Sequence, residues 1–231
     1  MQIDLTFTLA ELAYCDLRGK IAVVIDVFRF TTAALAALEA GAAGIYVVKE
    51  VEEAIELRAK DPRLLLAGER RALKVPGFDF GNSPLEFTNR VQGRRIVWCT
   101  TNGTNAVTMA AAADEVILAS LRSAAAAAEY LSARKKDCIL VPAGLRGRYS
   151  LEDTWCAGYI ARQLEGCAVS DSAQTAMCIA EHWSLRDLSA AQHGQVLLGL
   201  GMAADVEYCL ALNASPNVIR QDPLSGWCTL A

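Results

Sequence analysis

The sequence predicts an α/β protein with three layers, in which helices cover both faces of a largely parallel or mixed sheet. Short apolar runs rich in β-branched residues, of which residues 20–26 are the clearest, are typical of buried central strands. Helical patterns follow most of these runs, so strands and helices alternate along the chain. Hydrophobic residues make up 53% of the 231 residues, which is enough to form a large core.

The first half of the chain is expected to contain strand–helix units followed by a long loop. Gly41 closes the first helix. The loop at 71–93 combines proline, glycine and asparagine with phenylalanines that need burial, so we expect it to be ordered. The expected elements are a strand at 20–26, a helix at 31–40, a strand at 45–48, a helix at 51–60 and a strand at 64–67.

The second half is expected to be richer in helix, above all after residue 171. Pro142 ends the last central strand because proline cannot donate to a ladder. The expected elements are strands at 95–99, 115–118 and 138–141, helices at 104–113, at 122–135 and from 151 or 152 to 165, further helices at 171–183, 186–200 and 202–212, and a short strand at Val218-Ile219.

We expect these elements to form one domain over residues 1–231, with a subdomain division near residues 120–140 as an alternative. The segments VVIDVFRFTTAAL and IVWCTTNGTNAV share the order strand, turn, Thr-Thr, helix. They predict either two similar α/β subdomains around a cleft or simply two βα turns of one sheet. The apolar C-terminal helices also suggest a homodimer.

Composition argues against several classes of protein. The net charge is −4 and no long basic stretch occurs, so nucleic acid is not an expected partner. No apolar run is long enough to span a membrane, and the N-terminus lacks the regions of a signal peptide, so we expect a cytoplasmic protein. The eight cysteines form no CxxC pair, which argues against a zinc site. His182 and His193 are interpreted as ordinary helix or surface residues.

The candidate functional residues are the polar ones that follow the predicted strands. In open α/β sheets, ligands bind beyond the carboxyl ends of the strands. Acids, arginines and hydroxyl groups gather at these ends. They are Asp26, Arg29, Thr31 and Thr32 after the first strand, Glu69 and Arg70 after the strand at 64–67, Thr101, Asn102, Gly103 and Thr104 after the strand at 95–99, and Arg146, Arg148, Glu152 and Asp153 after the strand at 138–141.

The turn at 101–104, with the sequence TNGT, predicts an anion site. It leads into a helix N-terminus, where backbone N–H groups, hydroxyl groups and the positive end of the helix dipole attract negative charge. Gly103 would let the backbone approach the ligand closely. The alternative is that Asn102 or Thr104 only caps the helix.

Three acids predict a metal ion beside that anion. Asp26, Glu152 and Asp153 follow strands next to turns that suit a phosphate, and Mg²⁺ takes one or two carboxylates while keeping waters. The alternatives are that Asp26 pairs with Arg29 and that Glu152 and Asp153 only complement the helix dipole.

Arginines and an amide-containing turn complete the predicted site. Arginine side chains bind anionic oxygens through pairs of hydrogen bonds. The alternative, for at least one of the arginines here, is an ordinary surface residue. The GNSP segment at 81–84 presents two polar side chains to the ligand or forms a structural Asx turn. The residues concerned are Arg29, Arg70, Arg146, Arg148, Asn82 and Ser83.

Several familiar catalytic motifs are absent. The chain has neither the GxxxxGK[ST] of P-loop proteins nor a GxSxG. Position 28 is Phe, which argues against the DxD motif of haloacid-dehalogenase phosphatases. Cys99 stands where a nucleophile at a helix N-terminus would stand, but its place within a strand favours a packing role.

Four segments in this order resemble the 2-phosphosulfolactate phosphatase family, also called the ComB family. They are IDVFRFTTA (25–33), AGERRALKVPGFDFGNSP (67–84), TTNGT (100–104) and AGLRGRYSLEDTWCAG (143–158). The first motif of the family usually reads IDVLRATT, so Phe28 and Phe30 depart from it. This departure bears on the end of the substrate that carries no phosphate.

The resemblance implies a Mg²⁺-dependent phosphatase of three-layer fold with its site in a cleft. The substrate of the family is (R)-2-phospho-3-sulfolactate, which is cleaved to 3-sulfolactate and phosphate on the way to coenzyme M. Our leading hypothesis is therefore hydrolysis of the phosphate monoester of a 2-hydroxy acid, with Mg²⁺ held by Asp26 and one or both of Glu152 and Asp153. The alternatives are a phosphatase for a different small phospho-acid and a binding protein that keeps the anion cleft without turnover.

Overall fold

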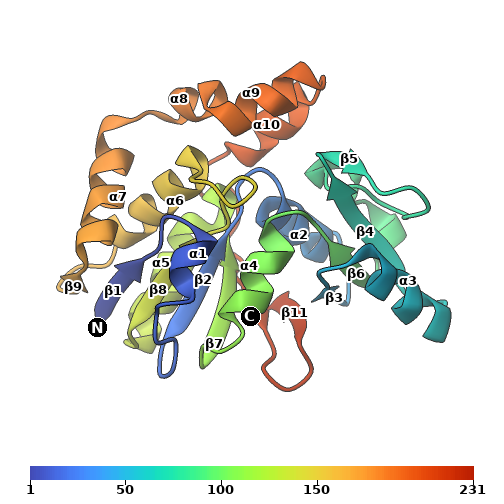
Figure 1. Ribbon diagram of the computed structural model, residues 1–231, viewed down its shortest axis with the longest axis horizontal. Helices are drawn as coiled ribbons and strands as arrows, with labels where there is room; N and C mark the ends of the chain where they lie inside the picture. Colours follow the sequence, from blue (N-terminus) through green and yellow to red (C-terminus); the bar gives the residue numbers. More distant parts are fainter.

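The computed structural model describes residues 1–231 and confirms the α/β class, with one mixed sheet at the centre of the molecule (Figure 1). Its strands are β1 (Gln2–Leu5), β2 (Ile21–Ile25), β3 (Gly44–Val47), β4 (Leu65–Arg70), β5 (Leu73–Lys74), β6 (Arg95–Cys99), β7 (Glu115–Ala119), β8 (Cys138–Pro142), β9 (Ala168–Val169), β10 (Ile219–Gln221) and β11 (Trp227–Leu230). The 11 strands run in the order β5-β4-β6-β3-β11-β10-β7-β2-β8-β1-β9.

The sheet consists of two parallel parts joined by an antiparallel hairpin. Strands β4, β6 and β3 are parallel to one another in one part, with β5 antiparallel to β4 at the edge, and β7, β2, β8, β1 and β9 are parallel to one another in the other part. The hairpin of β10 and β11 pairs with β7 on one side and with β3 on the other, and both pairings are antiparallel. The C-terminal strands therefore join the two parts into one sheet.

Ten helices surround the sheet. They are α1 (Leu9–Leu12), α2 (Phe30–Glu39), α3 (Val51–Lys60), α4 (Gly103–Ala110), α5 (Ala124–Arg134), α6 (Leu151–Arg162), α7 (Asp171–His182), α8 (Leu185–Ala190), α9 (Gln192–Gly199) and α10 (Ala203–Cys209), with short 3-10 helices η1 (Pro84–Glu86), η2 (Asn89–Val91) and η3 (Leu121–Ser123).

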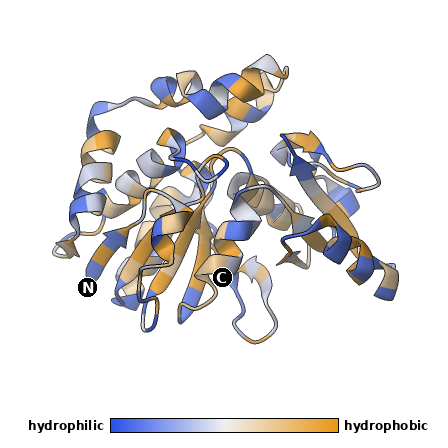
Figure 2. Cartoon of the chain, viewed as in Figure 1, coloured by the Kyte–Doolittle hydropathy of each residue, from blue (hydrophilic) through white to orange (hydrophobic).

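Alternation along the central strands divides the core between the two faces of the sheet. All residues of β2 are buried. Ile21, Val23 and Ile25 join a cluster that also contains side chains of α5, α6 and α7, while Ala22 and Val24 join a second cluster with α1, α2 and α4. A third, smaller cluster packs α3 against β4 and β6. Figure 2 shows the result: the central strands are hydrophobic and the outer helices mixed.

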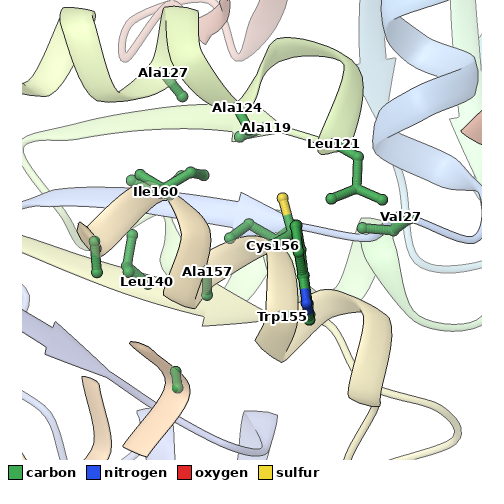
Figure 3. Packing of buried hydrophobic residues seen from close by; sticks show 14 of the residues in the cluster. Val27, Ala119, Leu121, Ala124, Ala127, Leu140, Trp155, Cys156, Ala157 and Ile160 are labelled. Carbon is green, nitrogen blue, oxygen red and sulfur yellow. The ribbon is translucent and has the colours of Figure 1, made fainter. Parts of the chain in front are cut away.

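Helix α6 lies very close to α7 because Gly158 has no side chain at their contact. Trp155, Cys156, Ala157 and Ile160 pack against side chains of β2, β8 and α5 (Figure 3). A Cβ atom on Gly158 would lie 2.0 Å from the carbonyl oxygen of Ala176 in α7. This close packing fixes the start of α6, which lies at the candidate site.

Most elements agree with the sequence-based prediction, and most differences lie in the first and last parts of the chain. Strands β1, β5, β9 and β11 and helix α1 were not predicted, and β5 lies within the segment predicted as a loop. The helix predicted at 186–200 is divided at Ala191, whose extended backbone (φ −63°, ψ 162°) separates α8 from α9. The helix predicted at 202–212 is shorter and spans Ala203–Cys209. None of the helices has the length and apolar character needed to cross a bilayer.

Candidate active site

A cavity of about 190 Å³ opens at the carboxyl ends of β2, β4 and β6. The loop after β8 and helix α9 form its remaining walls. Helices α8, α9 and α10 lie together along this end of the molecule (Figure 1). The predicted site residues that line the cavity are Asp26, Arg29, Glu69, Asn82, Thr101, Asn102, Arg146 and Arg148.

Asp26 is a buried carboxylate at the end of β2. Its Oδ1 atom accepts a hydrogen bond of 3.2 Å from the N–H of Phe30, and its Oδ2 atom lies against Gly103, where a Cβ would be only 2.5 Å away. Burial raises the pKa of Asp26 from 3.8 to about 6; His193 and the Phe30 N–H oppose the shift, and the carboxylates of Glu69 and Glu152 add to it. Burial therefore disfavours the charged form of Asp26, and no ion pair within the protein compensates for it.

The turn at 101–104 combines helix capping with free donors. Thr100 and Thr104 satisfy each other through their hydroxyl and amide groups, at 3.0 to 3.2 Å. The hydroxyl of Thr101 is buried and has no hydrogen-bond partner, although Thr101 lines the cavity. The amides of Asn102 and Gly103 donate to no protein acceptor. Thr100 and Thr104 therefore cap the start of α4, Asn102 makes no side-chain cap, and the anion site stays a prediction.

Gly103 serves a different contact from the one expected. A Cβ on this residue would lie 2.4 Å from the Phe30 ring and 2.5 Å from Oδ2 of Asp26. Only glycine lets the N-terminus of α4 approach the end of β2 this closely. Gly103 thus brings the turn to Asp26 rather than to open space in the cavity.

Glu69 holds two loops together at the edge of the cavity. Its Oε1 atom accepts the N–H of Thr101 and its Oε2 atom accepts the N–H of Ala72, both at 2.7 Å. Because both oxygens are used and the residue is 7% exposed, Glu69 acts first as a connection between β4 and the turn before α4.

The three acids predicted as metal ligands do not form one cluster. Asp153 accepts the N–H groups of Val27 (2.8 Å) and Gly144 (3.0 Å), so both of its oxygens tie loops together. Burial, together with the charges of Glu152 and Asp26, raises the pKa of Asp153, and the two N–H groups oppose the shift. Glu152 bonds His193 instead. No group of three or more His, Cys, Asp and Glu side chains is arranged to hold a metal ion.

His193 lies in the cavity, contrary to its interpretation as an ordinary helix or surface residue. Its Nδ1 atom is 2.9 Å from Oε1 of Glu152, a side chain that is only 1% exposed. The ring also meets Phe28 edge-on, with centroids 5.9 Å apart. These contacts fix the imidazole and leave its Nε2 atom for a ligand. His193 and Gln192 also line a second cavity of about 380 Å³, which Glu152 borders.

The arginines divide into two groups. Arg71, Arg146 and Arg148 line the cavity and make no ion pair. Arg70 instead donates to the carbonyl of Lys49 and to the sulfur of Cys99, both at 3.0 Å. Arg70 was predicted to reach the site, but Arg71, in the turn after β4, lines the cavity in its place.

Arg29 lines the cavity, and hydrogen bonds to other parts of the protein hold its guanidinium in place. Its Nη1 atom lies 2.6 Å from Oδ2 of Asp205 in α10, and its Nη2 atom donates to the carbonyl of Ala72 at 2.7 Å. The alternative that Arg29 pairs with Asp26 therefore does not hold, because Asp205 takes that place.

The remaining predicted residues support the site from outside the cavity lining. Thr31 and Thr32 bond the backbone of Asp26 and Val27, Cys99 packs in the third core cluster, and Ser83 donates to Asp205. Asn82 lines the cavity and accepts the indole N–H of Trp98 at 3.2 Å. The residues that do not reach the cavity are Thr31, Thr32, Arg70, Ser83, Gly103, Thr104, Glu152 and Asp153.

The comparison with known proteins agrees with this arrangement of motifs around one cavity. The sequence profile of the 2-phosphosulpholactate phosphatase family matches residues 7–223. The chain belongs to this family. Its members are named as phosphatases, so the chain is a phosphoric monoester hydrolase by family.

Three bacterial relatives illustrate the similarity, and each bears the name "probable 2-phosphosulfolactate phosphatase". The Carboxydothermus hydrogenoformans protein is 41% identical over 217 residues, covering 92% of this chain and 90% of its own length. The Clostridium perfringens strain 13 protein is 38% identical over 223 residues, with the same coverage. The Deinococcus radiodurans protein is 41% identical over 203 residues, covering 84% of this chain and 85% of its own.

The two departures from the usual family motif have different consequences in this 2-phosphosulpholactate phosphatase family member. Phe28 lines the cavity and contacts His193, so it shapes the space available to a ligand. Phe30 is fully buried and packs edge-on against Trp98, with centroids 5.7 Å apart. Only the change at position 28 therefore alters the cavity itself.

Proposed function

We propose that this protein hydrolyses the phosphate monoester of a small 2-hydroxy acid, with (R)-2-phospho-3-sulfolactate as the leading candidate and 3-sulfolactate and phosphate as products. One observation carries the proposal. A buried carboxylate, Asp26, faces a turn with an unpartnered Thr101 hydroxyl and a free Asn102 amide, in a cavity with three unpaired arginines. The candidate substrate has a phosphate, a carboxylate and a sulfonate, and these groups match such a set of donors.

The phosphate end is assigned to the turn before α4. The Thr101 hydroxyl, the amide of Asn102 and the positive end of the α4 dipole favour a dianion there. These donors are fixed by the Thr100–Thr104 cap before a ligand arrives. In phosphoryl transfer, catalysis rests mostly on such prearranged positioning and charge stabilisation.

The residues at this end also suit Mg²⁺. Oδ2 of Asp26 has no protein donor, and burial raises the pKa of this carboxyl to about 6, so a cation beside it would relieve an unfavourable charge. Mg²⁺ needs only one or two carboxylates because it keeps waters and binds substrate phosphate. Asp26 would hold it, and when bound it would neutralise charge on the phosphoryl oxygens. Asp153 is a poor ligand because two N–H groups occupy its oxygens.

The other end of the substrate is assigned to the arginines. Arg146 and Arg148 come from the loop after β8, and Arg71 from the turn after β4, so they approach the cavity from different elements. Arginine binds planar carboxylates and sulfonate oxygens through paired N–H groups. We propose that these side chains select a phospho-acid over a neutral phosphate ester.

His193 is placed to serve the leaving oxygen. The alkoxide that leaves a phosphorylated secondary alcohol is strongly basic and needs a proton. Glu152 fixes Nδ1, so Nε2 is the atom that can transfer a proton within the cavity. The attacking group is either a water molecule or the Asp26 carboxylate itself. Inversion of a chiral phosphate would indicate direct attack by water, and retention would indicate a phosphoaspartate.

The proposal is tested by phosphate release from a panel of phospho-2-hydroxy acids that includes phosphosulfolactate and phospholactate, with Mg²⁺ and with EDTA. Mg²⁺-dependent turnover that strongly favours the sulfonate is the expected result. Turnover spread over the panel would support the alternative of a different small phospho-acid. No turnover by folded protein on any member would indicate a binding protein without catalysis.

A further inference from the structure

We propose that Asp205 of α10 is a positioning residue for the phosphate end of the site, acting through Arg29 with the help of Ser83. The proposal rests on the proposed function, in which the turn before α4 binds the phosphoryl group, and it adds Arg29, which lines the same cavity, to the groups that bind there. It assigns a role to α10 and to Ser83 of the GNSP motif, and neither Asp205 nor Ser83 lines the cavity itself.

A hydrogen-bond network joins three distant parts of the chain. Oδ2 of Asp205 lies 2.6 Å from Nη1 of Arg29, and Oδ1 accepts the Ser83 hydroxyl at 2.6 Å. Side chains of both charged residues are almost fully buried, at 3% exposed for Arg29 and 8% for Asp205. The Ala72 carbonyl and the sulfur of Met202 accept the other hydrogen bonds of the guanidinium.

The pattern of these bonds leaves two donors of Arg29 for a ligand. Three of the five N–H groups bond the protein, all from the Nη atoms, so the Nε–H and one N–H of Nη2 remain. A guanidinium free to rotate would have to be ordered when a ligand binds, and that ordering would weaken binding. Asp205 orders it beforehand, and Ser83 in turn orders the carboxylate.

A buried ion pair is also compatible with a purely structural role, because loss of either charge leaves the other one buried and unpaired. The two roles differ in what they change. A positioning role concerns the phosphate end alone, whereas a general loss of structure weakens every ligand. Affinities for inorganic phosphate and for 3-sulfolactate, which represent the two ends of the candidate substrate, separate these roles.

The test compares Asp205→Asn, Ser83→Ala and Asp79→Asn with the full-length wild-type protein in the presence of Mg²⁺. Asp79 is the matched control: it makes a part-buried ion pair with Arg58 at 3.1 Å and accepts the N–H of Leu66, outside the cavity lining. Calorimetry measures binding of phosphate and of 3-sulfolactate, turnover of phosphosulfolactate gives kcat/KM, and thermal unfolding monitors folding.

For Asp205→Asn we expect phosphate affinity and kcat/KM to fall at least tenfold, with 3-sulfolactate affinity within twofold of wild type. Ser83→Ala, which keeps the ion pair, should show a smaller loss in the same direction. Asp79→Asn should lower the unfolding temperature and leave both affinities unchanged. In an Arg29→Met background, adding Asp205→Asn should weaken phosphate binding by less than twofold, because the residue acts through Arg29.

Three results would overturn the role of Asp205. These are unchanged phosphate affinity in both Asp205→Asn and Ser83→Ala, equal losses for phosphate and 3-sulfolactate, and an undiminished effect in the Arg29→Met background. If Asp205→Asn does not fold, Ser83→Ala decides the question alone. Wild-type protein that binds phosphate without turnover would reject the proposed function and leave this role open to the binding test, and wild-type protein that binds no phosphate would reject both.

Discussion

Asp26 shows at the scale of a single residue how a site is built at a cost in stability. The carboxyl lies in a buried position with other carboxylates nearby, and its pKa is raised to about 6 for that reason. When the pKa of a carboxyl group is higher in the folded than in the unfolded protein, the protein loses stability as the pH rises from the unfolded pKa to the folded one. Proteins tolerate such a cost where function requires it.

We therefore predict that Asp26→Asn abolishes Mg²⁺-dependent turnover and stabilises the metal-free protein at pH 8. The amide keeps an acceptor for the Phe30 N–H but carries no charge. The rise in the pKa of Asp26 from 3.8 to about 6 limits the gain in the free energy of unfolding to roughly 3 kcal/mol. The folded pKa lies above the unfolded one, so the advantage of the variant should grow between about pH 4 and pH 6 and then level off. Thermal unfolding in EDTA across this range measures it.

His193 gives a second prediction at this scale, based on the leaving group. Replacing it with Gln keeps a polar side chain but removes the proton donor. For phosphate esters of alkyl alcohols we expect kcat to fall by about 10²- to 10⁴-fold. For p-nitrophenyl phosphate, whose leaving group needs no proton, the fall should be much smaller. Equal losses for both substrates would show that His193 does not protonate the leaving oxygen.

Helix N-termini and strand ends determine the site at the scale of secondary-structure elements. α4 meets the end of β2 only because Gly103 has no side chain, and α6 meets α7 only because Gly158 has none. These two glycines make similar close contacts, but only the first lies beside Asp26. They allow loss of packing to be separated from loss of function.

We predict that Gly158→Ala and Gly103→Ala both destabilise the protein, by about 1–3 kcal/mol each, because a methyl group must be accommodated in a full core. In Gly103→Ala the displaced atoms include Oδ2 of Asp26, which is 2.5 Å from the new Cβ position. Turnover should therefore fall at least tenfold in this variant, while the folded fraction of Gly158→Ala stays active. Denaturant unfolding and kcat measured on the same samples distinguish the two.

The whole molecule forms the cavity from segments that are far apart in the sequence. The sheet supplies Asp26, Glu69 and the turn at 101–104, and α9 supplies His193 across the cavity. Arg29 and Asp205 join the sheet to α10. A ligand in this cavity therefore contacts both the central sheet and the C-terminal helices.

We expect Mg²⁺ and phosphate together to slow hydrogen exchange in α9 and α10 as well as at the start of α4. Binding to the folded state stabilises it by mass action, and the effect extends to every element that the ligand bridges. The α3 helix, which packs on the sheet in a separate core cluster, serves as an internal reference. Protection confined to α4 would show that the C-terminal helices take no part in binding.

Local patterns determined most of what could be predicted. Buried strands and their helices were located from apolar runs, since five consecutive buried residues of β2 leave a clear signal. Polar residues after these strands were found because carboxyl ends of parallel strands share one edge. The motifs identified the family, which the profile match over residues 7–223 confirms.

Only the tertiary structure decided which of those residues meet in the cavity. Arg70 and Arg71 are neighbours in sequence, but only Arg71, in the turn after β4, lines the cavity, whereas Arg70 bonds Lys49 and Cys99. Asp153 looks like a metal ligand in sequence, but two loops converge on its oxygens. His193 and Asp205 come from a helical segment with no motif, 167 and 176 residues beyond Asp26 and Arg29 respectively. Sequence patterns record local periodicity and chemistry, whereas contacts across such separations arise only when the chain is packed.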